Sequence, residues 1–122
     1  MRSVMVGLVA VLLVSTAWGQ EKLDLSGQDI TDEQLAEKLK GLTKLEELSL
    51  GYTKITDAGL VHLKGLTNLE WLFLEDTQIT DAGLVHLKGL TNLKHLSLWN
   101  TKITDAGVQE LKKALPDCYI RH

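Results

Sequence analysis

The stretch ITDAGLVHLKGLTNL occurs twice in this chain, from Ile55 to Leu69 and again from Ile79 to Leu93. Its first three letters also occur at Ile30 and Ile103, so that the four copies begin 25, 24 and 24 residues apart. Repetition at a nearly fixed spacing is typical of proteins built by stacking one structural unit. We count about four and a half units, with atypical units at both ends.

Each unit changes its hydrophobic periodicity halfway through. Residues 93–98 read LKHLSL, in which apolar and variable residues alternate as in a short strand. Leu84, Leu87 and Leu90 lie three residues apart, which is typical of the apolar stripe of a short helix. A strand, a turn, a helix and a turn in every unit predict a right-handed coil with parallel strands on one side and helices on the other.

Polar residues and glycines mark where each helix begins and ends. Thr80 supplies a capping hydroxyl, and Asp81 places an acid at the positive end of the helix. In the first copy, Thr31 and Gln34 match the capping-box pattern. Gly89 follows the last helical turn, where we expect it to adopt the left-handed conformation.

The combined pattern LxxLxLxxTxITDAGLxxLxxL is similar to the leucine-rich repeat over roughly Leu23 to Ile120. The resemblance implies an α/β fold, a right-handed leucine-rich-repeat solenoid with short parallel strands on its concave face and short helices on its convex face. It also implies that the concave face binds other macromolecules, usually proteins. Where this family usually carries Asn or Cys, this chain has Thr53, Thr77 and Thr101, with Gln28 in the first unit. We expect the threonine hydroxyls to bond the backbone of the neighbouring coil.

The two most similar units differ mainly within one window, which reads LEWLFLEDT at 69–77 and LKHLSLWNT at 93–101. If Leu72 and Leu74 point into the core, alternation turns the residues between them outward. We predict that the residues on the concave face and at its rim bind a partner: Glu47, Tyr52, Trp71, Phe73, Glu75, Asp76, His95, Ser97, Trp99 and Asn100.

Random divergence is the alternative explanation for these differences. The convex helix positions are equally exposed, yet Val61, His62 and Lys64 recur unchanged one unit later. Exposed aromatic residues that lie close together mark interaction sites, and Trp and Tyr dominate binding energy at interfaces. We therefore predict a non-enzymatic binding module with a protein partner. Glycan or envelope polysaccharide binding on the same face, and a purely structural role, are the alternatives.

The first 19 residues have the features of a secretory signal peptide. Arg2 precedes an apolar run from Val4 to Val14, and Ala17 and Gly19 stand at the −3 and −1 positions of a cleavage site. An uncleaved membrane anchor is the alternative, although the run is shorter than the roughly 20 apolar residues of a spanning helix. We predict a secreted or periplasmic repeat domain at 20–122, with no membrane span after cleavage.

Charge and cysteine content exclude several classes of function. The formal net charge is −3, and it becomes −4 without Arg2, which argues against nucleic acid or anionic membrane surfaces as partners. Cys118 is the single cysteine, so the chain has no internal disulfide. We expect Cys118 to be a small apolar filler, the alternative being a reactive thiol.

Several residues suggest a metal or catalytic site without completing one. His62 and His86 lie one repeat apart, but a zinc site needs further ligands, so we predict no metal and no cofactor. His95, Ser97 and Asp76 have the composition of a nucleophilic site, but no nucleophile elbow or oxyanion loop accompanies them. We therefore predict that the chain is not an enzyme.

The glycines of the repeated TDAG sequence do not form a phosphate-binding loop. Gly59, Gly83 and Gly107 stand in neither of the glycine-rich patterns that cradle phosphates. We expect them to permit close packing between successive coils.

Overall fold

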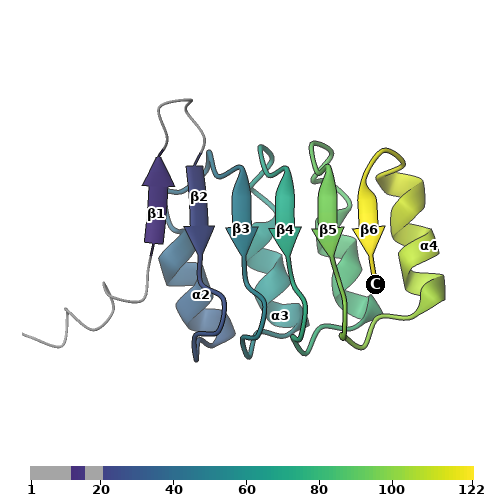
Figure 1. The fold of residues 1–122 in the computed structure, drawn as a ribbon, viewed down its shortest axis with the longest axis horizontal. Helices are drawn as coiled ribbons and strands as arrows, with labels where there is room; N and C mark the ends of the chain where they lie inside the picture. The colour runs from purple at the N-terminus through teal and green to yellow at the C-terminus, as the bar shows by residue number, and fades with distance from the viewer. Residues whose placement is uncertain (1–11, 16–20) are drawn as a thin grey trace, which may run out of the picture.

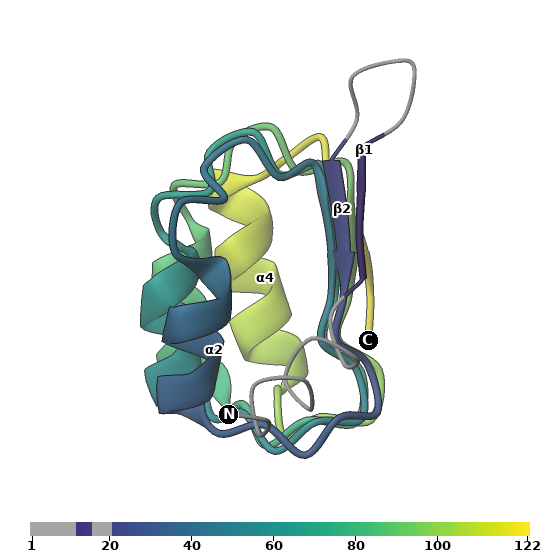
Figure 2. The same cartoon turned by 90° about the vertical axis from the view of Figure 1, so that its left-hand side faces the viewer.

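The computed structural model describes residues 12–15 and 21–122, which form a two-layered coil. In this part of the chain the strands make one six-stranded sheet in chain order, with the helices on one of its faces (Figures 1 and 2). The strands are β1 (Leu12–Ser15), β2 (Glu21–Asp24), β3 (Glu47–Ser49), β4 (Trp71–Phe73), β5 (His95–Ser97) and β6 (Tyr119–Arg121). The helical segments are α2 (Asp32–Leu39), α3 (Asp57–Leu60), the 3₁₀ helices η1 (Val61–Leu63) and η2 (Asp81–Leu87), and α4 (Asp105–Ala114).

Strands β2 to β6 are parallel, and their register follows the sequence repeat. Leu48 pairs with Leu72, Leu72 with Leu96, and Leu96 with Ile120, a step of 24 residues each time. Between β2 and β3 the step is 25 residues, because Leu23 lies opposite Leu48. The α/β solenoid with parallel strands on one face and short helices on the other is confirmed.

Strand β1 lies within the segment predicted to be a signal peptide. It runs antiparallel to β2, with Leu13 opposite Leu23 (Figure 1). Most of that segment, including the predicted cleavage site after Gly19, lies outside the described residues. In the described ranges, no helix combines the length and apolar character needed to cross a membrane.

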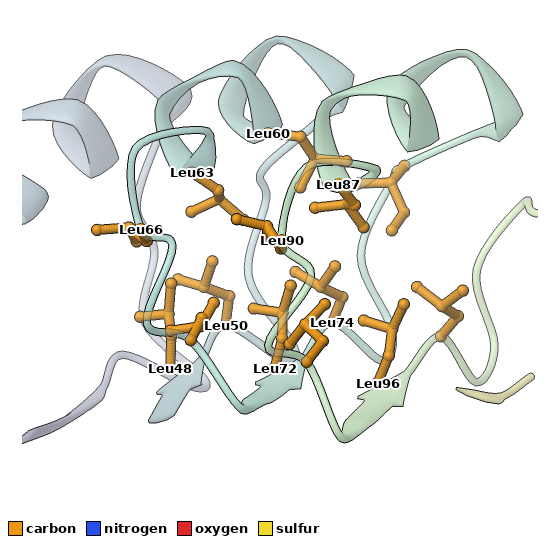
Figure 3. Close-up of a cluster of buried hydrophobic side chains, with 14 of the residues drawn as sticks. Leu48, Leu50, Leu60, Leu63, Leu66, Leu72, Leu74, Leu87, Leu90 and Leu96 are labelled. Carbon is orange, nitrogen blue, oxygen red and sulfur yellow. The ribbon is translucent and has the colours of Figure 1, made fainter. Parts of the chain in front are cut away.

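Leucines from the two layers meet to form a continuous core. Leu48, Leu72 and Leu96 project from the strands, and Leu60 and Leu87 project toward them from the helices (Figure 3). All five are completely buried. Full burial of one such side chain contributes about 1.5–3 kcal/mol to the stability of the folded state. Because the leucines of each unit pack against those of the adjoining units, each unit stabilises its neighbours on both sides.

Cys118 packs in the same core and is 1% exposed. Burial raises the pKa of its thiol, an effect that the nearby Lys112 ammonium partly opposes. A buried, protonated thiol is a poor nucleophile. The prediction that Cys118 serves as an apolar filler is confirmed.

The predicted helix starts are confirmed, whereas one predicted helix end is wrong. The Thr80 hydroxyl accepts a hydrogen bond from the Ala82 amide at 3.3 Å. Gly89 does not take up a positive φ; in the described residues only Gly27 and Gly41 do so among the glycines. Segment η2 ends in successive three-residue turns, with the Leu90 amide donating to the Leu87 carbonyl at 3.0 Å, and such turns need no left-handed residue.

The threonine hydroxyls bond within their own coil and not, as predicted, to the neighbouring one. The Thr53 hydroxyl donates to the Leu50 carbonyl and the Thr77 hydroxyl to the Leu74 carbonyl, both at 2.7 Å. The turn after each strand places the carbonyl three residues earlier within direct reach of the hydroxyl, and Thr101 makes the same bond to Leu98. Each threonine therefore stabilises the turn that follows its strand.

Aspartates at the helix starts, and not the threonines that follow the strands, connect one coil to the next. Both carboxylate oxygens of Asp57 accept hydrogen bonds from Thr80 of the following coil, from its amide at 2.7 Å and its hydroxyl at 2.5 Å. The same arrangement, which we call the Asp–Thr junction, joins Asp32 to Thr56 and Asp81 to Thr104. The hydrogen bonds from Thr104 lower the pKa of Asp81.

The TDAG glycines provide the space that each Asp–Thr junction needs. A Cβ atom at Gly83 would collide with the Asp57 carboxylate, and Gly59 and Gly107 face the equivalent aspartates. The prediction that these glycines permit close packing between coils is confirmed.

Two different contacts stand at the ends of the series of junctions. In the first coil Thr31 and Gln34 form the predicted capping box, in which the Thr31 amide donates to the Gln34 side chain at 2.9 Å. In the last coil, the Asp105 carboxylate lies 2.9 Å from the His122 ring. The Thr31 amide thus bonds to Gln34, and Asp105 contacts a histidine ring, where the residues of the three junctions pair an aspartate with a threonine.

Candidate interaction surface on the concave sheet

The parallel register arranges the outward-facing side chains of the concave face in columns that cross the strands. One column runs from Glu47 through Trp71 and His95 to Tyr119. A second runs from Ser49 on β3 through Phe73 and Ser97 to Arg121. Because these residues are paired in register, their side chains share one face of the sheet, as the sequence predicted.

The aromatic rings of three strands contact one another on this face. The Trp71 and His95 rings are stacked with centroids 5.2 Å apart, and the His95 and Tyr119 centroids are 5.1 Å apart. Phe73 joins them, with its centroid 5.8 Å from that of His95. We call these four residues, three from the first column and Phe73 from the second, the aromatic column. Trp71 is 41% exposed and Tyr119 is 60% exposed, so the column presents a large apolar surface to solvent.

A second group of large side chains lies next to the aromatic column. Trp99 is 47% exposed, and the Arg121 guanidinium lies over its ring, 5.8 Å from the centroid. Tyr52 and Glu75 join them around a hollow of about 290 Å³. Such a contact between a cation and a ring contributes about 0.5–1 kcal/mol at an exposed site, which favours one orientation of both side chains.

The predicted rim residues share a backbone conformation. Tyr52, Asp76 and Asn100 have φ values of 60°, 57° and 57°, in the left-handed region. The Asn100 amide donates a hydrogen bond to the Asp76 carboxylate. Asp and Asn tolerate this region better than most residues, whereas a bulky tyrosine is unusual there. The chain therefore turns at the same place in three coils and holds these side chains at one rim.

Ser97 occupies the predicted column but is not available at the surface. It is 5% exposed, so the expectation that it faces solvent is wrong. Its side chain is short, and in the register it lies between the much larger Phe73 and Arg121. Among the described residues no hydrogen bond joins Ser97 to His95 or Asp76, so the three do not form a connected catalytic group.

Charged side chains surround the aromatic residues. Some of them form ion pairs, whereas among the described residues Glu75 has an oxygen without a hydrogen-bond partner. Lys22 and Glu47 form an ion pair at 3.5 Å between β2 and β3, and Lys94 and Glu70 form another at 3.3 Å. Within residues 21–122, by contrast, Glu75 Oε1 is buried and has no hydrogen-bond partner. A buried carboxylate oxygen without a donor has a cost in free energy.

Tyr119, Arg121 and Lys22 also belong to this face, although they were not predicted from the sequence. The last copy departs from the repeat pattern, so that its strand contains only Ile120 as an inward-facing residue. Counting one further repeat of 24 from His95 would have identified Tyr119, because strand pairing preserves that step.

On the convex face, the residues that the structure describes form no cluster of aromatic rings. His62 lies on η1 and His86 on η2. In the described part of the chain, His, Cys, Asp and Glu side chains nowhere gather in groups of three or more that could hold a metal ion.

Comparisons with known proteins agree on one family. Residues 67–113 match the model described as leucine-rich repeats in two copies, and residues 41–63 match a leucine-rich repeat model, so the matches cover more than half of the chain. No curated protein matches.

Solved structures with the same architecture include two bacterial proteins. One is a leucine-rich repeat protein of Leptospira interrogans, with 29% sequence identity and a TM-score of 0.60 over 80% of this chain. The other is an internalin, InlF, of Listeria monocytogenes, with 25% identity and a TM-score of 0.55 over 80% of this chain. The chain spans 24% of the first structure and 33% of the second.

Proposed function

The chain belongs to the leucine-rich repeat proteins, and we propose that it binds another protein through its concave face. Members of this family are typically non-enzymatic modules for binding. The observation that carries the proposal is the aromatic column together with Trp99 and Tyr52, all on one face or at its rim. Clustered, exposed aromatic residues supply large contact area and most of the binding energy at protein interfaces.

The ring geometry favours a protein over a glycan on this face. Sugar rings bind by lying flat on an exposed aromatic face. Here one face of Trp71 is covered by His95, and a face of Trp99 is covered by Arg121. The edges of stacked rings contact irregular protein surfaces well, but they provide a poor platform for a flat sugar.

The size of the face sets how a partner must engage it. Five parallel strands about 4.8 Å apart make a sheet roughly 20 Å wide. A stable interface uses about 800 Å² from each partner. A protein partner would therefore have to cover most of the concave face, including both the Trp71 and the Trp99 regions.

We expect the double substitution Trp71→Ala, Trp99→Ala to weaken partner binding by at least about a hundredfold, because central aromatic residues each contribute about 2 kcal/mol or more. The partner is first captured from the native envelope or culture medium with the wild-type chain, and its affinity is then measured by calorimetry. The matched control is Val61→Ala, Val85→Ala on the convex face, where both side chains are also exposed.

Unchanged affinity in the tryptophan double variant, with the fold intact by circular dichroism, would contradict the proposal. Capture of polysaccharide in the absence of protein would support the glycan alternative. Concentration-dependent oligomers that persist in the double variant would support a purely structural role.

We also propose that the chain is exported and that residues 1–19 are removed. The support is the positively charged start, the apolar run and the small residues Ala17 and Gly19. N-terminal sequencing of the protein recovered outside the cytoplasm is expected to begin at Gln20. Recovery of a chain that still begins at Met1 would contradict the proposal.

A further inference from the structure

We propose that the partner inserts an arginine side chain into a groove over β3, an inference that rests on the proposed protein-binding function. We call this feature the β3 groove. It consists of two adjoining hollows of about 350 and 360 Å³ that share Lys22, Glu47 and Phe73. Trp71, Ser49 and Glu75 complete the part of the lining that matters here.

Small residues on β3 create the depth of the groove. Ser49 lies in register between Asp24 on β2 and Phe73 on β4, so a short side chain separates two longer ones. One alternation further along, Gly51 has no side chain at all, and the Glu75 carboxylate lies over it. The equivalent positions on the next coil, Phe73 and Glu75, are larger and form one wall.

Trp71 brings an exposed aromatic ring to the groove, because it is 41% exposed and lines the hollow next to Glu47. Its ring stacks against His95 on the β5 side, with an interplanar angle of 22°. The Phe73 ring also stacks on it, with centroids 6.5 Å apart and an interplanar angle of 23°, and both rings line the same hollow. A guanidinium held against the exposed part of the Trp71 ring contributes about 0.5–2 kcal/mol, depending on how well it is desolvated.

The charges in the groove call for a cation. Glu47 and Glu75 line it from neighbouring strands, and Asp24 lies at its β2 side, whereas Lys22 is the one cation in its lining. Glu75 Oε1 lacks a donor within the described residues. An arginine suits this combination better than a lysine, because its planar fork stacks on a ring while it donates to carboxylates in two directions.

Lys22 occupies part of this site in the free protein. Its ammonium lies 3.5 Å from Glu47, but the side chains are 43% and 32% exposed, respectively. Such an exposed pair contributes at most about 1 kcal/mol, so an incoming arginine can displace it. Lys22 thus competes with the ligand, which gives substitutions at Lys22 and Glu75 opposite expected effects.

The test uses the protein with the tripeptide acetyl-Gly-Arg-Gly-amide as probe and NMR chemical shifts as readout. The arginine peptide is expected to cause saturable shifts at the Gly51 amide and the Trp71 indole. The same peptide with citrulline, which keeps the shape of arginine but lacks its charge, is expected to cause none. Glu75→Gln should weaken binding about tenfold, since it removes a charge-assisted contact, and Lys22→Gln should strengthen it a few-fold.

Glu110→Gln is the matched control, because Glu110 lies on the convex helix α4. It should leave the affinity for the arginine peptide unchanged. Equal shifts with the arginine and citrulline peptides would overturn the inference, as would arginine binding that Glu75→Gln and Lys22→Gln leave unaltered. If the wild-type protein does not distinguish the arginine peptide from the citrulline peptide, but Trp71→Ala, Trp99→Ala still weakens partner binding, the arginine site in the β3 groove is rejected. The proposed protein-binding function then still stands.

Discussion

Leu72→Ala is expected to lower the free energy of unfolding by about 2–5 kcal/mol, the range for truncating a buried leucine in a well-packed core. Leu72 is completely buried on the middle strand of the parallel set, with Leu48 and Leu96 opposite it on both sides. The cavity would therefore weaken the contacts of three coils at once. In a solenoid each coil is stabilised mainly by its neighbours, which leaves no separate core to compensate.

Urea unfolding followed by circular dichroism measures this change. Val85→Ala is the control, because Val85 is 57% exposed on the convex face and its truncation should change stability by no more than about 0.5 kcal/mol. A loss below about 1 kcal/mol for Leu72→Ala would show that the coils are not coupled through this core.

Gly83→Ala is expected to destabilise the protein by about 2–3 kcal/mol, although alanine normally favours a helix over glycine by about 1 kcal/mol. The new methyl group would collide with the Asp57 carboxylate. That carboxylate would have to move, and its two hydrogen bonds to Thr80 would be lost. Hydrogen bonds to a charged group contribute about 1.5–3 kcal/mol each, so their loss outweighs the gain in helix propensity.

A double-mutant cycle separates the collision from other effects of the methyl group. In the Asp57→Ala background the carboxylate is absent, so Gly83→Ala should cost much less there, the remaining close contact being with the flexible end of Leu60, whose Cδ1 would lie 2.8 Å from the new Cβ atom. Gly89→Ala is the matched control, since a Cβ atom at Gly89 has nothing within 4 Å and the residue has no positive φ. Additive effects of the substitutions at positions 57 and 83 would disprove a role for the Asp–Thr junction.

The order of strands and helices could be predicted because every unit repeats the same leucines. The spacing of Leu72 and Leu96 in the sequence equals their register in the sheet, so one alignment of the copies yields the whole architecture. The same register pairs Trp71 with His95, both predicted to lie on the concave face, and their rings stack in the structure. A repeat thus converts sequence spacing into spatial adjacency.

The details that could not be predicted depend on contacts between coils or on the size of neighbouring side chains. Asp57 has the pattern of an ordinary helix-start acid, and nothing local shows that its carboxylate turns toward Thr80 in the next coil. Ser97 has the outward phase of its strand, but its exposure depends on how far Phe73 and Arg121 extend over it. Alternation predicts the direction of a side chain, whereas its accessibility requires the neighbours.

Identical Asp–Thr junctions also make the protein tolerant of changes in its own length. An unequal crossover between the duplicated segments at 55–69 and 79–93 would add or remove one complete unit. Every new boundary would again place an aspartate against a threonine and a glycine, as Asp57 now stands against Thr80 and Gly83. The contacts of Gln34 and His122 lie outside the duplicated segments and would be unchanged. Recombination could therefore widen or narrow the concave face by one strand at a time while leaving each coil correctly joined.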